Sequence, residues 1–81
     1  IGKFWFFNTA SVYIANTVIS NKHIALDIAG STVYLNHTVT GTGNTVGIRC
    51  GSGYGIRGGF VQKGGASIAG EEQKQYGGQI W

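Results

Sequence analysis

The sequence has no proline, no methionine and a single cysteine, Cys50, among its 81 residues. One cysteine excludes an internal disulfide, so the chain is not a disulfide-stabilised miniprotein. Charged residues are also scarce: they make up 11% of the chain, under half of the usual share. Two Leu stand against nine Ile, six Val and seven Thr, a balance that favours strands over helices. The composition therefore argues against a helical bundle, a coiled coil and a charged disordered tail.

Positive charge is present, but it is not concentrated. Six Lys and Arg against three acidic residues give a formal charge of +3, and the basic residues are scattered along the chain. Nucleic-acid binding normally shows basic residues clustered on one face, so we expect no nucleic-acid partner. No apolar run approaches the roughly 18 residues of a membrane span, and we expect none. Because the sequence begins with Ile1 and not with Met, we expect a processed chain or a segment of a longer one.

An internal repeat is the strongest signal in the sequence. The segment 12–18 (VYIANTV) recurs as 33–39 (VYLNHTV), with Val, Tyr, Thr and Val in matching places. Further along, Ile24, Leu26 and Ile28 fall over Val46, Ile48 and Cys50, with one residue inserted near Gly43. A weaker third repeat aligns Tyr54, Ile56 and Phe60 with Val12, Ile14 and Val18. Further along, Ile68-Ala69-Gly70 repeats Ile28-Ala29-Gly30. Towards the start of the chain, Trp5 and Phe7 take the positions of Leu26 and Ile28.

Alternation within each repeat predicts short strands with one inward face. Ile24, Leu26 and Ile28 are apolar, whereas Ala25 and Asp27 lie at the positions that point outward. Repeats of about 20 residues with short strands and glycine corners are typical of a β-solenoid, in which each coil stacks on the next. Glycines at the corners supply the positive φ angles of sharp bends. We therefore predict about three coils of a short parallel β-solenoid in residues 1–70 and a polar loop or linker in 71–81. A small antiparallel β-sandwich is the alternative.

The pattern V-Y-[IL]-x-x-T-V followed by [IV]-x-[LI]-x-[IC]-x-[GS] resembles the right-handed parallel β-helix of pectate-lyase-like proteins and phage tailspikes. The resemblance covers about residues 4 to 70. It implies a fold that hosts lyases, hydrolases, adhesins and inert spacers alike. The likeness to tailspikes also implies a trimer around a long axis.

Two residue pairs are candidates for contact with carbohydrate. Tyr13 and Tyr34 share an outward column, about 5 Å apart in stacked coils. They predict either a platform for sugar rings or an aromatic ladder that stiffens the sheet. Asp27 and Arg49 share another outward column, and pectate lyases, which this fold resembles, use acidic residues that hold calcium and an arginine base. Hydrolysis needs two carboxylates and calcium needs several oxygens, so an ion pair between coils is the favoured interpretation.

The remaining reactive side chains predict no site. Cys50 aligns with inward Ile28 and is interpreted as a small core residue, whereas His23 and His37 lack ligand-spaced partners. We therefore expect no catalytic residue, no metal and no cofactor. Asn36-His37-Thr38 is a glycosylation sequon, which has meaning only in a secretory host.

The first functional hypothesis is a structural or adhesive segment of an extracellular fibre or phage tail spike that binds cell-surface glycan or acts as a spacer. The second is a part of a polysaccharide-degrading enzyme whose catalytic acids lie elsewhere, and the third is a self-stacking filament subunit. Short solenoids expose strand edges unless they are capped, and neither Phe4–Phe7 nor Gln79–Trp81 resembles a polar cap. We therefore expect a homo-oligomer, trimeric or stacked, or a longer parent chain, with an extracellular or virion location.

Overall fold

The computed structural model describes residues 2–7, 11–51, 58–70 and 74–81, and these residues form ten strands and no helix. The strands are β1 (Lys3–Phe7), β2 (Val12–Ile14), β3 (Ile24–Ala29), β4 (Thr32–Leu35), β5 (Thr40–Gly41), β6 (Val46–Cys50), β7 (Phe60–Gln62), β8 (Ser67–Ile68), β9 (Lys74–Gln75) and β10 (Gln79–Ile80). Every strand pair in this described part is parallel. The prediction of an all-β protein with parallel strands is confirmed, and the antiparallel sandwich is wrong.

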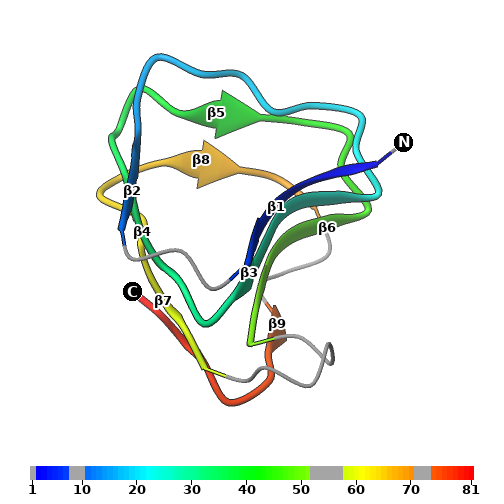
Figure 1. The fold of residues 1–81 in the computed structure, drawn as a ribbon. Helices are drawn as coiled ribbons and strands as arrows, with labels where there is room; N and C mark the ends of the chain where they lie inside the picture. The colour runs from blue at the N-terminus through cyan, green and yellow to red at the C-terminus, as the bar shows by residue number, and fades with distance from the viewer. Residues whose placement is uncertain (1, 8–10, 52–57, 71–73) are drawn as a thin grey trace.

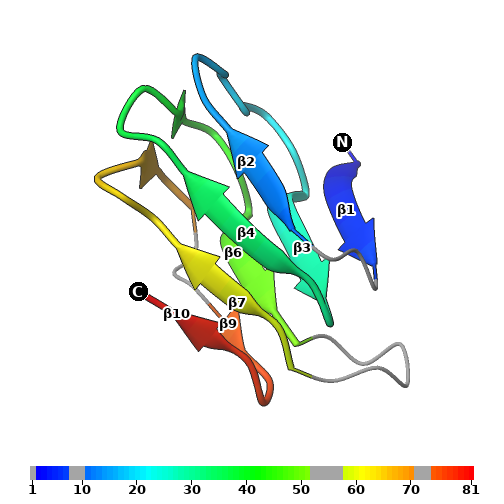
Figure 2. The same ribbon diagram turned by 60° about the vertical axis from the view of Figure 1, so that its left-hand side comes forward.

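The strands form three sheets that the chain visits in turn. Sheet A has the order β1-β3-β6-β9, sheet B has the order β10-β7-β4-β2, and sheet C pairs β5 with β8. Figure 1 shows the three sheets around a common interior. In Figure 2 the strands of sheet B lie in order, with β2 at one end and β10 near the C-terminus at the other.

The register of the central strands is the one that the repeat predicts. Val12, Tyr13 and Ile14 of β2 pair with Val33, Tyr34 and Leu35 of β4. In sheet A the paired residues are Ile24 with Val46, Leu26 with Ile48, Asp27 with Arg49, and Ile28 with Cys50. Parallel pairing with matched apolar residues places each inward side chain directly over the next.

The predicted register of β1 is wrong by one residue. Phe4 and Phe6 pair with Leu26 and Ile28, and Trp5 pairs with Asp27 on the outward side. A register shift between Lys3 and Phe4 causes this difference, because one extra residue reverses the face of all that follow. Phe6 packs against the core, whereas Trp5 is 49% exposed.

The predicted register of the third repeat is also wrong in the residues that the structure describes. Phe60 pairs with Thr32, so its neighbour Val61 is the inward residue, over Val33. Ile68 pairs with Gly41 in sheet C, away from Ile28. The segment between β6 and β7 is longer than the one between β3 and β4, and alternation alone does not set a register across connections of unequal length. Tyr54 and Ile56 lie outside the described residues.

Val18 and Val39 match in sequence but not in space. Val18 pairs with Thr40 and is 71% exposed, whereas Val39 is fully buried. Ile19, at 1% exposure, takes the inward position after Val18. The connection from β4 to sheet C in the second repeat is therefore one residue longer than the connection from β2 to sheet C in the first.

Part of the C-terminal tail continues the sheets, although residues 71–81 were predicted to be a polar loop or linker. β9 pairs with β6, and β10 pairs with β7. The Tyr76 amide donates to the Cys50 carbonyl at 2.8 Å, and Gly78 lies so close to Cys50 that a Cβ there would be 2.5 Å from Sγ. Polar residues pair here because parallel strands are held by backbone hydrogen bonds, which any non-proline residue makes.

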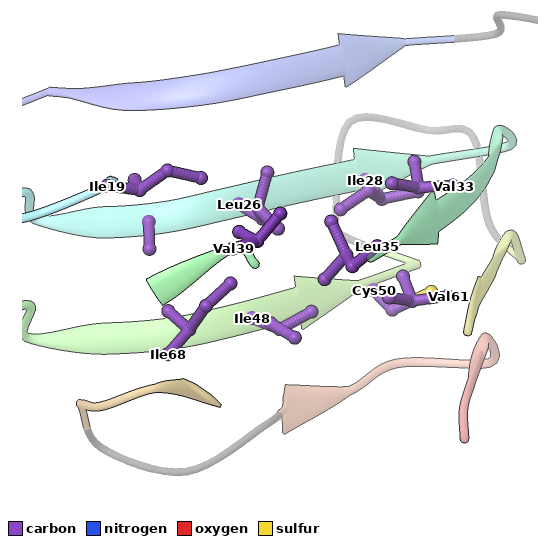
Figure 3. Packing of buried hydrophobic residues seen from close by; sticks show 11 residues of the cluster. Ile19, Leu26, Ile28, Val33, Leu35, Val39, Ile48, Cys50, Val61 and Ile68 are labelled. Atoms are coloured by element: carbon purple, nitrogen blue, oxygen red, sulfur yellow. The ribbon is translucent and has the colours of Figure 1, made fainter. Parts of the chain in front are cut away.

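Apolar side chains from all three sheets fill the interior (Figure 3). The largest buried residues include Ile19, Leu26, Ile28, Val33, Val39, Ile48 and Val61. Gly30 and Gly51 follow β3 and β6 with φ of 71° and 78°, as expected for glycine corners. Asn44, which is only 7% exposed, joins three segments from inside: Oδ1 accepts from the Lys22 amide, and Nδ2 donates to the carbonyls of Ile19 and Ala69.

Candidate functional site

Four aromatic rings cross the outer face of sheet B, and we call them the aromatic strip. Tyr13 comes from β2, Tyr34 from β4 and Phe60 from β7, and Trp81 directly follows β10. They lie outside because Ile14, Leu35, Val61 and Ile80, next to them in sequence, pack on or within the core, and neighbours in a strand point to opposite faces. Successive ring centroids are 4.8, 6.2 and 6.5 Å apart. The strip therefore runs across the strands of sheet B.

The two tyrosines form an offset stack. Their rings are nearly parallel, at 13°, with centroids 4.8 Å apart. Carbon atoms in contact are about 3.5–4.0 Å apart, so the rings are displaced sideways and part of a face stays uncovered. Tyr13 is 78% exposed and Trp81 is 68% exposed. The arrangement thus stiffens the sheet and also leaves aromatic surface for a ligand.

A hollow of about 280 Å³ adjoins the tyrosines. It is lined by Tyr13, Ile14, Ala15, Tyr34, Leu35 and Asn36. Its wall is mainly apolar, and Asn36 adds a polar residue at the turn after β4. Apolar surface with a few polar groups at its edge is typical of small-molecule sites.

Sequence reasoning found half of the strip. It placed Tyr13 and Tyr34 in one outward column, and the register confirms that placement. It missed Phe60 and Trp81, because Phe60 was aligned with the wrong residue and Trp81 was assigned to the linker. The alternation around Val61 and Ile80 was the available signal, but it becomes visible only when β7 and β10 are known to share a sheet.

Asp27 and Arg49 form the expected ion pair, and Lys3 joins it. Arg49 Nη2 lies 2.6 Å from Asp27 Oδ2 and Arg49 Nε lies 3.1 Å from Oδ1, while Lys3 Nζ lies 2.8 Å from Oδ2. The side chain of Asp27 is fully buried, and those of the two cations are about a quarter exposed. The pair is therefore more than the weak surface contact that was expected.

The surroundings of Asp27 keep its carboxylate ionised. Burial by itself would raise the pKa of Asp27, but hydrogen bonds from Arg49 and Lys3 and their positive charges outweigh burial and lower that pKa. The hydrogen bond to Asp27 is the largest influence on Arg49 and raises the pKa of its guanidinium. A general acid or base must hold and release a proton near neutral pH, so this carboxylate is suited to joining the strands of sheet A and not to proton transfer.

The candidate residues do not meet in one place. Tyr13 and Tyr34 lie on sheet B, whereas Asp27 and Arg49 lie on sheet A. Cys50 is buried and its Sγ donates to the Gln79 carbonyl at 3.7 Å, and desolvation raises the pKa of its thiol. Among the described residues, no group of three or more His, Cys, Asp and Glu side chains could hold a metal ion.

Comparison with protein-family models, curated proteins and solved structures found no match to this chain. Within the described ranges, no helix has the length and apolar character needed to cross a membrane.

Proposed function

We propose that the chain is a short parallel β-solenoid segment, similar to the right-handed parallel β-helices, that contacts glycan through the aromatic strip. Support for the solenoid comes from the parallel pairing of all described strand pairs and from the way the chain visits the three sheets in turn. The setting that fits such a module is an extracellular fibre or a phage tail spike, where it serves as an adhesive or spacing element.

The continuous run of four rings is the observation that carries the proposal. Sugar rings have apolar C–H faces that pack on aromatic faces, while their hydroxyls bond to polar groups nearby. Two uncharged polar groups lie beside the strip: Gln79 Oε1 accepts from Trp81 Nε1 at 3.3 Å, and Asn36 lies at the hollow. A neutral polysaccharide that crosses the strands of sheet B is therefore the favoured ligand.

Replacing Tyr13 or Trp81 with alanine tests this proposal. An aromatic pair contributes about 0.5–1.5 kcal/mol; with a contact of similar strength between each ring and a sugar, each variant should bind a neutral polysaccharide about 2- to 10-fold more weakly than the original chain. Titration calorimetry against a panel of soluble neutral and acidic polysaccharides gives the affinities. Val18→Ala is the matched control, because Val18 is 71% exposed but belongs to the sheet C side.

Two results would contradict glycan contact at the strip. One is a chain that binds no polysaccharide of the panel, and the other is a loss of affinity in Val18→Ala equal to that in Tyr13→Ala. Unchanged thermal unfolding of the variants shows that any loss is local.

We also propose that the two ends of the sheets pair with further copies of the chain or with further coils. In the described part, β1 and β2 are edge strands at one end, and β9 and β10 are edge strands at the other. Open edges pair with other strands unless proline or charge blocks them; the sequence has no proline, and each of the edge strands β1 and β9 has one charged residue, Lys3 and Lys74. Light scattering over a range of concentrations should give masses that are multiples of 8.6 kDa, whereas a monomer throughout would overturn self-assembly.

A further inference from the structure

The turn after β4 carries the sequon Asn36-His37-Thr38, which occurs once in the sequence. Asn-x-Ser/Thr, with x other than proline, is the acceptor pattern of N-linked glycosylation. Asn36 and His37 are exposed, and Thr38 is half-buried. The triplet therefore lies at the surface of the folded chain, in the connection between sheets B and C.

Hydrogen bonds within the triplet hold the Asn36 side chain by its oxygen. The amide and the hydroxyl of Thr38 both donate to Asn36 Oδ1 at 3.0 Å. The hydroxyl oxygen of Thr38 in turn accepts from the Asn16 amide at 2.7 Å. The turn therefore holds the Asn36 carboxamide through its oxygen and not through Nδ2.

The backbone of the turn is anchored on both sides of Asn36. Its amide donates to the Ile14 carbonyl at 2.9 Å, and its carbonyl accepts from the Val39 amide at 3.0 Å. Val39 itself is fully buried, so the turn has a defined conformation and its exposed residues project from a fixed base. Asn36 is thus presented at the surface of the folded chain on a fixed turn.

We propose that Asn36 is a site of N-linked glycosylation that is competent in the folded chain. The donor is an oligosaccharide joined through a diphosphate to a lipid. A bond forms between Asn36 Nδ2 and the anomeric carbon, and the bond from that carbon to the diphosphate oxygen breaks. The diphosphate leaves with the bonding electron pair, and one Nδ2 proton passes to a base of the transferase.

A glycan at Asn36 has a consequence for the aromatic strip, and this step rests on the proposed function. Asn36 lines the same hollow as Tyr13 and Tyr34. An oligosaccharide attached there would cover the tyrosine end of the strip and compete with free polysaccharide. Glycosylation of Asn36 thus inhibits the binding of polysaccharide to the aromatic strip.

The test for the modification uses the intact chain, secreted from a eukaryotic cell line and also purified unmodified from bacteria. Intact mass before and after treatment with peptide N-glycosidase measures occupancy. Asn36→Gln and Thr38→Val should lose the modification, whereas Thr38→Ser should keep it because the hydroxyl remains. The folded bacterial chain, given an oligosaccharyltransferase and its lipid-linked donor, should be modified at Asn36 without denaturation.

Two outcomes overturn the proposal: a secreted, folded chain of unmodified mass, or modification of the bacterial chain only after it has been denatured. Thermal unfolding of Thr38→Val checks that its loss of modification is not a loss of fold. This inhibition is measured separately, as weaker polysaccharide binding by the modified chain than by the unmodified bacterial chain, which keeps Asn36. If the mass shows modification but neither form binds polysaccharide, the proposed function fails while the acceptor site stands.

Discussion

Asn44→Ala is expected to lower the free energy of unfolding by about 3 kcal/mol. The side chain is 7% exposed, and it satisfies the Lys22 amide and the carbonyls of Ile19 and Ala69 at 3.0, 2.9 and 3.1 Å. Alanine removes this partner from all three groups; the bond to the Ile19 carbonyl is buried and the other two are partly buried, and an unsatisfied buried group costs about 1–3 kcal/mol. Urea denaturation, followed by circular dichroism, gives the difference.

The neighbouring Thr45→Ala is the control for Asn44, because the Thr45 side chain is exposed and its backbone bond to the Lys22 carbonyl is kept. It should change stability by less than about 0.5 kcal/mol. Asn44→Asp keeps the shape but replaces the donor nitrogen by an anionic oxygen facing two carbonyls, so it should be at least as damaging as alanine. Equal stability of Asn44→Ala and Thr45→Ala would show that Asn44 does not join the three segments.

Asp27→Asn is expected to reduce the stability of the chain at neutral pH by about 2 kcal/mol. Removing one member of a buried ion pair costs about 3–5 kcal/mol, and the cost is lower here because Lys3 and Arg49 reach water with about a quarter of their side chains. The variant leaves two cations close together without the charge that joins them. Chemical denaturation at pH 7 measures the loss.

The pH dependence of this difference has a definite sign. The pKa of Asp27 is lowered in the folded state below its ordinary value of 3.8. Its contribution to stability is therefore complete above the unfolded-state pKa and is lost as the pH falls through the lower folded-state pKa. The stability difference between the original chain and Asp27→Asn should be constant near neutral pH and should shrink below about pH 4.

Glu71 and Glu72 carry the only other side-chain carboxylates, so the double variant Glu71→Gln, Glu72→Gln is the control for acid titration. It should retain the acid-dependent loss that Asp27→Asn removes. An Asp27→Asn chain whose stability falls with acid as steeply as that of the original chain would refute the role assigned to this carboxylate.

The sequence was most informative within strands whose residues match from one repeat to the next. Val12 could be paired with Val33 and Leu26 with Ile48, although one residue is inserted between these two pairs, because each strand keeps its own alternation. The Tyr13–Tyr34 pair followed from the same alignment. Half of the candidate surface was thus predictable from a repeat of matched residues.

The predicted register was wrong where one of two aligned segments has an extra residue. The shift after Lys3 pairs Phe4 and Phe6, in place of Trp5 and Phe7, with Leu26 and Ile28. An extra residue before sheet C separates Val18 from Val39. Alternation has a period of two, so a single extra residue exchanges the two faces without leaving any trace in the pattern itself.

Composition and repeat by themselves determined that this chain forms short parallel strands and that Asp27 meets Arg49, but they placed Ala25 and Asp27 on the outer face, whereas both are fully buried. Only the tertiary structure decided which aromatic residues share a surface, because Tyr13, Tyr34, Phe60 and Trp81 come from four strands joined by connections of different lengths. The tertiary structure also decided that Lys3 joins the Asp27–Arg49 ion pair and that the Asn44 side chain makes hydrogen bonds in the interior. The physical reason is that local sequence sets the alternation of side chains, whereas register across a sheet depends on the full length of chain between its strands.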